Sequence, residues 1–406
     1  MSIYVYLCRL NDGFDDHRLH IDDTEKMIIG FDAKRIVRNG TGLGSFGRTL
    51  VNDLSALEAF DMRLYAPDAG KDRLRSQVLE SDGLHFCYPR HAHTAIGKAL
   101  WRSHGMVQQM VSDGVQLFHG LSGELPLGLA KAAIRSVVTI HDLIFMRHPE
   151  YYNSSDVKIY TRKFHSAISH ADRIVAISEC TRRDISELGE IDPSRIDLIY
   201  QSCAPRFSLQ NAADPNPTLW QVRDFYDLPD RYILSVGSIE ERKNVLLAVR
   251  ALHRLPDDVS LVVVGRSTPY VDRVWKYVCD SHLFGRVTML HDVPDDHLPA
   301  LYRMADAFVY PSRYEGFGIP VIEAIRMGLP VVACTGSCLE EAGGPHSIYV
   351  SPDGDEAMAA AIAQVLTGAP GRQRRIELSQ EYVRRFDNTG AAQRYADLYR
   401  EVLGEL

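Results

Sequence analysis

Residues 307–323 read AFVYPSRYEGFGIPVIE. The first four residues are apolar or aromatic, which predicts a buried strand. Gly316 and Gly318 then predict a loop, and Pro320 suits the first turn of a helix that continues through Glu323. A strand, a glycine-bearing loop and a helix in this order form the repeating unit of a parallel α/β sheet.

The same unit recurs along most of the chain, which predicts two parallel sheets. In the first half we expect strands at 27–32, 63–66, 84–88, 115–120, 136–142, 173–178 and 195–200. Helices are expected at 44–57, 94–111, 155–169 and 179–188. In the second half we expect strands at 232–237, 260–265, 287–290, 307–311, 330–333 and 347–350. The predicted fold class is therefore α/β, with two Rossmann-like, doubly wound domains whose strand ends face a common cleft.

The length supports this division, because 406 residues exceed the size at which a single core stops growing. We expect an N-terminal extension at 1–26 and a first Rossmann-like domain at 27–207. A segment rich in Pro, Asn and Asp predicts a linker at 208–222. The second domain is expected at 223–385, and a final helix at 386–406.

Composition excludes several classes of protein. The net charge of −8 argues against a dedicated nucleic-acid binder. No apolar run approaches the ~20 residues that span a bilayer, and the opening MSIYVYLCRLNDGFDDHR lacks the features of a signal peptide. Seven cysteines without a CxxC pair indicate reduced thiols and no structural metal. We therefore expect a cytoplasmic protein.

The loop and helix of the opening stretch carry the strongest functional signal. Free backbone N–H groups around Gly318 and Ile319, at the start of the helix, attract phosphate. Glu315 precedes the helix and Glu323 lies one turn inside it, so both carboxylates can face the cleft. There they can accept hydrogen bonds from the hydroxyl groups of a sugar or ribose. A plain strand–loop–helix connection remains the alternative.

A second signal lies at Val236-Gly-Ser-Ile-Glu-Glu-Arg-Lys-Asn244, which follows another expected strand. The adjacent cations Arg242 and Lys243 could clamp a diphosphate at the start of the next helix. A solvated run of mixed charges is the alternative.

Two features of the first half complete the set of candidate residues. Gly42-x-Gly44-x-x-Gly47 resembles a dinucleotide fingerprint, but no acidic residue ends a second strand at the required distance, so we expect only a flexible loop lining the cleft. His141 ends a strand and could donate to a substrate hydroxyl. We favour a structural role for His119.

These segments together resemble the retaining glycosyltransferases of family 4, which have the GT-B fold, over roughly residues 27–404. The most specific match is Glu315-x7-Glu323 with its Phe-Gly-Ile-Pro centre. The supporting motifs, in chain order, are TGLG (41–44), VTIHD (138–142), ADRIVAIS (171–178), VGSIEERKN (236–244) and LPALY (298–302).

The resemblance implies a nucleotide-diphospho-sugar donor held mainly by the second domain, with no other cofactor. It implies that Lys243, helped by Arg242, contacts the diphosphate near Gly318 and Ile319, and that Glu323 binds the ribose. The implied donor-sugar contacts are Glu315, the backbone of Phe317, Gly318 and Ile319 and, from the first domain, His141, with Glu315 and His141 as the catalytic residues. The segment Gly42, Leu43 and Gly44 is implied to cover the phosphates and acceptor. Many relatives have an Arg directly after the strand that ends at Gly237, where this chain has Ser238.

The implied activity is metal-independent transfer, with retention, of mannose or another hexose to a glycan or lipid-linked acceptor in cell-surface polysaccharide synthesis. Another GT-B enzyme, such as a sugar-nucleotide epimerase, and a non-catalytic sugar-nucleotide-binding subunit remain the alternatives. Ile96, Leu100, Trp101, Val107 and Met110 predict an amphipathic helix at 95–111. It either packs on its own sheet or meets the inner face of the membrane.

Overall fold

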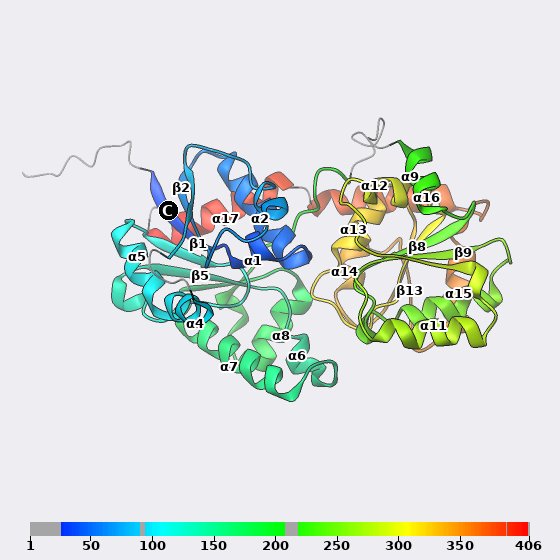
Figure 1. Cartoon of the computed structure of the whole chain (residues 1–406), viewed down its shortest axis with the longest axis horizontal. Coiled ribbons are helices and arrows are strands. Elements are labelled where there is room, and N and C mark those ends of the chain that lie inside the picture. Colours follow the sequence, from blue (N-terminus) through cyan, green and yellow to red (C-terminus); the bar gives the residue numbers. More distant parts are fainter. Residues whose placement is uncertain (1–25, 90–93, 208–217, 387, 405–406) are drawn as a thin grey trace, which may run out of the picture.

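The protein consists of two parallel-sheet domains that lie side by side, as a computed structural model shows (Figure 1). The structure describes residues 26–89, 94–207, 218–386 and 388–404. The expected extension at 1–26, except for its last residue, and most of the expected linker therefore lie outside the described residues. The predicted fold class is confirmed, and every strand range expected from the sequence overlaps a strand of the structure.

The first domain contains a seven-stranded sheet in the order β3-β2-β1-β4-β5-β6-β7, with all neighbours parallel. Its strands are β1 (Met27–Asp32), β2 (Phe60–Tyr65), β3 (Leu84–Cys87), β4 (Leu117–Gly120), β5 (Arg135–Ile140), β6 (Arg173–Ala176) and β7 (Ile196–Leu198). Its helices are α1 (Lys34–Arg38), α2 (Gly42–Ser55), α3 (Asp72–Arg75), α4 (Ala95–Leu100), α5 (Met106–Ser112), α6 (Ile144–Arg147), α7 (Ser154–His170) and α8 (Glu179–Gly189).

The second domain contains a six-stranded sheet in the order β10-β9-β8-β11-β12-β13, again parallel throughout. Its strands are β8 (Tyr232–Val236), β9 (Ser260–Val264), β10 (Val287–Leu290), β11 (Ala307–Tyr310), β12 (Val331–Cys334) and β13 (Ile348–Val350). Its helices are α9 (Leu219–Tyr226), α10 (Val245–Ala251), α11 (Tyr270–Asp280), α12 (Leu298–Met304), α13 (Ile319–Arg326), α14 (Leu339–Gly343), α15 (Asp355–Ala363) and α16 (Arg372–Val383). Because α9 begins at Leu219, residues 219–222 are helical rather than part of a linker.

The last helix, α17 (Asn388–Leu403), returns to the first domain and lies beside α2 (Figure 1). Its Tyr395 and Tyr399 are fully buried in the first core. Tyr399 Oη lies 2.7 Å from Nδ1 of His119, and the other ring nitrogen of His119 lies 2.8 Å from Thr139 Oγ1. His119 is therefore a structural residue, as predicted from the sequence.

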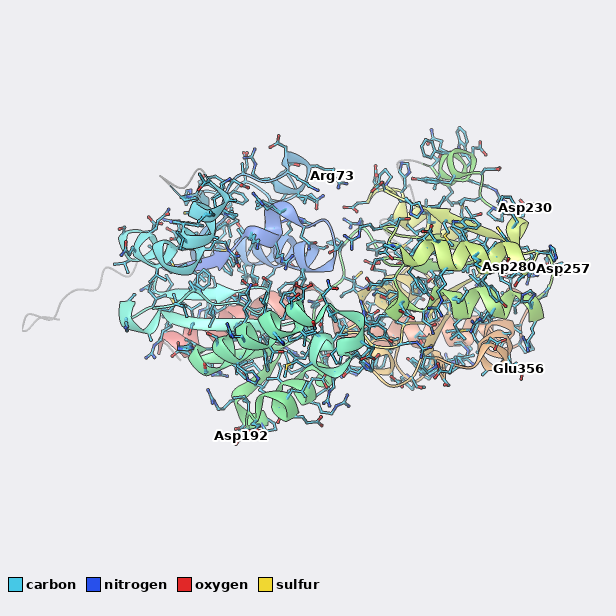
Figure 2. All side chains as sticks on the ribbon, turned by 60° about the horizontal axis from the view of Figure 1, so that its bottom comes forward. Arg73, Asp192, Asp230, Asp257, Asp280 and Glu356 are labelled. Atoms are coloured by element: carbon cyan, nitrogen blue, oxygen red, sulfur yellow. The ribbon has the colours of Figure 1, made fainter. Side chains whose placement is uncertain are left out.

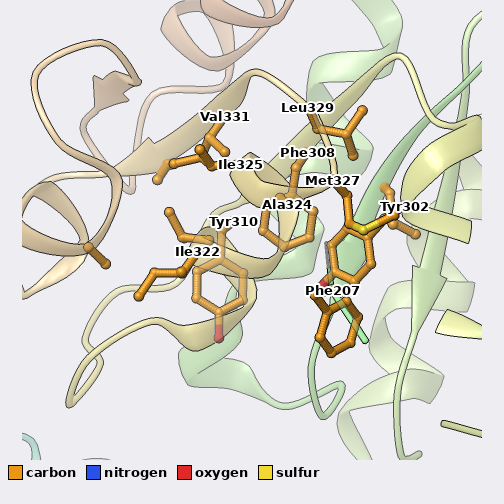
Figure 3. Close-up of a cluster of buried hydrophobic side chains, with 14 of the residues drawn as sticks. Phe207, Tyr302, Phe308, Tyr310, Ile322, Ala324, Ile325, Met327, Leu329 and Val331 are labelled. Carbon is orange, nitrogen blue, oxygen red and sulfur yellow. The ribbon is translucent and has the colours of Figure 1, made fainter. Parts of the chain in front are cut away.

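The two domains also share a core. Phe207, at the end of the first domain, packs edge-on against Tyr302 of α12, with ring centroids 5.6 Å apart. Tyr302 in turn contacts Phe308 of β11 in the cluster shown in Figure 3. The labelled charged side chains in Figure 2, such as Asp192, project from the periphery of the molecule. Burial of apolar side chains thus joins the domains along the connecting segments.

The expected helix at 95–111 is interrupted. A π-helical turn at Trp101–Gly105 separates α4 from α5. Met110 of α5 is fully buried, whereas Ile96 and Leu100 of α4 are 75% and 62% exposed. Only the second half of this segment therefore packs firmly against its own domain.

Candidate active site

The candidate site lies where the order of the second sheet reverses. Strand β8 pairs with β9 on one side and with β11 on the other, so the connections that follow β8 and β11 leave in opposite directions. Ligands of open α/β sheets bind at such switch points, beyond the carboxyl ends of the strands. The connection after β8 carries Arg242 and Lys243 in a short 3-10 turn, and the connection after β11 carries Glu315.

The side chains of Arg242, Lys243 and Glu315 contact one another. The sequence alone placed them at two strand ends but did not show that they touch. Lys243 Nζ lies 2.5 Å from Glu315 Oε1 and donates to Tyr310 Oη at 2.7 Å. Arg242 Nη1 lies 3.1 Å from Glu315 Oε2, and Ser312 Oγ donates to the same carboxylate at 2.6 Å. Glu315 is 8% exposed. Burial alone would raise the pKa of Glu315, but Arg242 and Lys243 outweigh it and lower the pKa to about 2.

Arg242 also braces the loop that carries Glu315. Its Nη1 donates to the carbonyl of Tyr314 at 2.6 Å, and its Nη2 donates to Glu240 at 2.7 Å. Its own carbonyl accepts from the backbone N–H of Arg313 at 2.9 Å. The guanidinium is thus held by protein groups, while the ammonium of Lys243 lies beside a cavity.

This cavity is small and is lined by residues that include Gly237, Ser238, Lys243 and Tyr310. The backbone of Gly237 approaches that of Gly265 so closely that a Cβ at Gly265 would lie 1.8 Å from the Gly237 carbonyl oxygen. The glycine at position 265 therefore permits the close approach of the segments that follow β8 and β9, beside Lys243.

Helix α13 begins next to this cluster. Gly318 occupies the N-cap with φ of 106°, a conformation that favours glycine, and Pro320 lies in the first turn as expected. The backbone of Gly318 and Ile319 is thus at the helix start, as predicted. Phe317 is 3% exposed, and its ring stacks on that of Tyr200 with ring centroids 5.6 Å apart. The side chain of Phe317 therefore belongs to the core that the two domains share.

Glu323 lies one turn into α13 and is partly buried. Tyr302 Oη donates to Glu323 Oε2 at 2.8 Å. Burial raises the pKa of Glu323 to about 7, against the opposing effect of the Tyr302 hydrogen bond. The two carboxyl groups of the motif thus have pKa values that differ widely, because Arg242 and Lys243 outweigh burial at Glu315, whereas the Tyr302 hydrogen bond and the charge of Arg206 do not outweigh it at Glu323.

The first domain supplies His141 and Asp142, which follow β5. The ring of His141 is held on both sides, since Nε2 lies 2.8 Å from the Leu121 carbonyl and Nδ1 lies 2.7 Å from Gln201 Nε2. Burial lowers the pKa of His141 to about 4, so the ring is neutral near pH 7. An amide that donates to Nδ1 leaves the proton on Nε2, where it bonds Leu121. The ring is therefore oriented by the protein itself.

Asp142 is a residue of the site that the sequence analysis did not single out, although it stands in the VTIHD motif. Burial raises the pKa of Asp142, and two charged groups of the second domain act on it as well: Arg242 lowers this pKa and Glu315 raises it. A Cβ at Gly316 would lie 3.1 Å from Cβ of Asp142. Its position directly after His141 was the available signal.

Gly42, Leu43 and Gly44 differ from expectation in local structure. They form the first turn of α2 rather than a flexible loop, with Thr41 at the N-cap. A Cβ at Gly44 would lie 1.8 Å from the Asn39 carbonyl oxygen, so glycine is needed for the close approach of this helix start to the preceding turn.

Residues 223–382 match the family described as "Glycosyl transferases group 1", and residues 41–202 match "Glycosyltransferase Family 4". Each of the two domains thus matches a glycosyltransferase family model of its own.

Relatives of the chain include O-antigen chain mannosyltransferase B of Escherichia coli, which is 31% identical over 62% of the chain and 65% of the relative. O-antigen chain mannosyltransferase RfbU of Salmonella typhimurium is 28% identical over 56% of the chain and 60% of the relative. The chain thus spans somewhat less than two thirds of the length of these relatives.

Solved structures agree on the fold. Sucrose-phosphate synthase of Thermosynechococcus elongatus superposes with a TM-score of 0.76 at 20% identity, over 94% of the chain and 100% of that structure. Anabaena HepE in complex with UDP-glucose gives a TM-score of 0.73 at 16% identity, over 93% and 100%. These neighbours establish the GT-B arrangement of two Rossmann-like domains.

Within the described residues, no group of three or more His, Cys, Asp or Glu side chains is arranged to hold a metal ion. Across the same parts of the chain, no helix has the length and apolar character needed to cross a bilayer.

Proposed function

We propose that the protein transfers a hexosyl group from a nucleotide-diphospho-sugar to a glycan or lipid-linked acceptor, with retention of configuration and without a metal ion. Mannose is the sugar favoured by the O-antigen mannosyltransferases among its relatives, and cell-surface polysaccharide synthesis is the corresponding process. The observation that carries the proposal is the cluster of Lys243, Arg242 and Glu315 beside the start of α13.

The chemistry of the leaving group explains why this cluster is needed. When the bond between the anomeric carbon and the diphosphate oxygen breaks, negative charge accumulates on the nucleoside diphosphate. Preorganised cations and helix N–H groups stabilise such charge most effectively in a site from which water is excluded. Lys243 and the backbone of Gly318 and Ile319 would bind the diphosphate. Arg242 would hold the loop that carries Glu315, and its positive charge would add to the stabilisation of the diphosphate.

The donor also requires groups that recognise its hydroxyls. Glu315 remains ionised at neutral pH and can accept hydrogen bonds from the sugar. Glu323, further along α13, would accept from the ribose. Lys243 already contacts Glu315. When the diphosphate binds, the ammonium group of Lys243 would divide its hydrogen bonds between the Glu315 carboxylate and the diphosphate.

The configuration is retained because the acceptor oxygen attacks the anomeric carbon from the same face of the sugar ring from which the diphosphate departs. The acceptor oxygen bonds to the anomeric carbon, the anomeric carbon–diphosphate bond breaks, and the acceptor proton passes to the departing phosphate oxygen. Glu315 is held by two cations, which makes it a stabiliser of positive charge on the sugar rather than a covalent nucleophile. His141 and Asp142 would complete the site from the first domain.

The acceptor is expected at the first domain, on the cytoplasmic face of the membrane if it is lipid-linked. The exposed Ile96 and Leu100 of α4 would then approach the membrane surface. Replacing both by Glu should reduce co-sedimentation with vesicles that contain anionic phospholipid. Phe284→Glu, which changes a 72% exposed side chain of the second domain, is the matched control.

Thermal-shift screening of GDP-mannose, UDP-glucose and related sugar nucleotides tests the proposal first, because a ligand that binds the native state raises its melting temperature. Transfer from the bound donor to extracts of lipid-linked glycans, followed by determination of the anomeric configuration, then tests activity and retention. Conversion of the donor without any acceptor would favour an epimerase. Binding without turnover in the presence of acceptor extracts would favour a non-catalytic subunit.

A further inference from the structure

The loop that carries Glu315 is held by the other domain. At the start of α8 in the first domain, Ser178 Oγ lies 2.6 Å from the carbonyl oxygen of Gly316 in the second. Thr181 Oγ1 lies 3.1 Å from the carbonyl oxygen of His141 and 3.2 Å from that of Gly316. Ser178 and Thr181 are 0% and 1% exposed, so no bulk water competes for these bonds.

The number of available protons assigns the bonds. Each hydroxyl has a single proton to donate. Ser178 Oγ accepts from the backbone N–H of Thr181 at 2.9 Å, as an N-cap residue does, and it lies closer to the Gly316 carbonyl, at 2.6 Å, than to Thr181 Oγ1, at 3.0 Å, so its proton goes to Gly316. Thr181 Oγ1 lies almost equally far from the carbonyls of His141 and Gly316 and shares its proton between them. Ser178 thus holds the loop after β11, and Thr181 bridges that loop and the end of β5.

Further contacts show that the arrangement is built rather than incidental. Tyr314 Oη donates to Asp184 of α8 at 2.6 Å, and Asp184 also accepts from Arg147 at 2.8 Å. A Cβ at Gly316 would lie 2.2 Å from the carbonyl oxygen of His141, so only glycine allows the two segments to approach this closely. The residues on both sides of Glu315 are thus fixed by side chains or backbone of the first domain.

We propose that Ser178 and Thr181 are positioning residues for the donor sugar: they place Gly316, and with it Glu315, so that the sugar end of the donor is recognised only when the two domains touch. This inference rests on the proposed function. The diphosphate end depends on Lys243 and the start of α13, which belong entirely to the second domain. Loss of the bridge should therefore weaken recognition of the sugar more than recognition of the nucleotide.

Thr181→Val tests this, because valine keeps the shape of the side chain and removes the hydroxyl. Affinities of GDP, GDP-mannose, UDP and UDP-glucose for the full chain are measured by calorimetry, and each sugar nucleotide is compared with its nucleoside diphosphate. We expect the affinity for the effective sugar nucleotide to fall roughly 5- to 10-fold, the loss typical of one buried hydrogen bond, while the diphosphate changes less than about twofold. Thr181→Ser should restore the affinity.

Ser186→Ala is the matched control, since this hydroxyl on the same helix donates to the Ile191 carbonyl at 2.7 Å, within the first domain. Tyr314→Phe provides a second variant at the interface if Thr181→Val proves unstable, and should show the same selective loss. Equal weakening of sugar nucleotide and diphosphate, or behaviour matching Ser186→Ala, would overturn the inference. Wild-type protein that binds none of the four ligands would instead refute the proposed function.

Discussion

Replacement of Lys243 by Met is the most direct test of the diphosphate site. Methionine retains the length and apolar stem of lysine but removes the ammonium group, whose contacts are Glu315 at 2.5 Å and Tyr310 at 2.7 Å. The variant should fold, because Glu315 keeps Arg242 at 3.1 Å and Ser312 at 2.6 Å as partners. Loss of one partner from a buried ion pair usually costs ~3–5 kcal/mol, and the remaining cation should limit the loss to about 2 kcal/mol.

The effect on binding follows from the same contacts. A hydrogen bond to a charged group contributes ~1.5–3 kcal/mol, which corresponds to roughly 10- to 150-fold in affinity. Since Lys243 is already paired with Glu315 in the free protein, part of this gain is offset when the diphosphate binds. We therefore expect the affinity for a nucleoside diphosphate to fall about tenfold.

Calorimetric titration of GDP and UDP into wild type and variant measures this change, and urea denaturation measures the stability. Lys276→Met is the matched control, because Lys276 is 75% exposed on α11 and pairs only with Asp280 of the same helix among the contacts that the structure records. Unchanged nucleotide affinity in a folded Lys243→Met variant would refute the assignment of Lys243 to the diphosphate.

Four other outcomes are expected. Glu315→Gln should lower turnover by at least about tenfold with little change in nucleoside diphosphate affinity, whereas Glu323→Gln should mainly weaken donor binding; equal small effects in steady-state kinetics would favour a purely structural motif. The pKa of Glu323 is about 7 in the folded chain and ~4.3 when unfolded. The folded wild type therefore loses stability relative to the unfolded chain as the pH rises between these values, because only the unfolded chain ionises Glu323 readily. Glu323→Gln does not titrate, so its unfolding free energy relative to wild type should increase from pH 5 to pH 7.5 and level off above it. Activity should persist in excess EDTA, and loss of activity that manganese or magnesium restores would contradict metal-independent transfer. Truncation after Arg385 removes Tyr395 and Tyr399 from the first core, so scanning calorimetry should show melting of the first domain at a lower temperature while the second domain still binds nucleoside diphosphate.

Much of the fold could be predicted from short-range patterns. Apolar runs followed by glycine-bearing turns identify the strands and their carboxyl ends, and these ends are where ligands of doubly wound sheets bind. That is why Lys243 and Glu315 could be selected before their positions were known. The buried structural role of His119 was also predicted, because a histidine inside an apolar strand usually finds hydrogen-bond partners.

Several features depend on contacts between residues far apart in sequence. Lys243 and Glu315 are 72 positions apart and meet only because β8 and β11 are neighbours in the sheet. Gly42 and Gly44 looked like a flexible loop, but the close approach of Asn39 makes them the first turn of α2. Local glycine content indicates freedom of the backbone, whereas tertiary packing decides how that freedom is used.

The order of amino acids fixes which residue types stand at the strand ends, and therefore the chemistry that each end can offer. Which of these groups contact one another depends on how the two domains fold and pack. Ser178 and Thr181 have the pattern of an ordinary helix start, and only the juxtaposition of the domains turns their hydroxyls toward His141 and Gly316. The physical reason is that capping and hydrophobic periodicity act over a few residues, while hydrogen bonds between domains require surfaces brought together by the burial of a shared core.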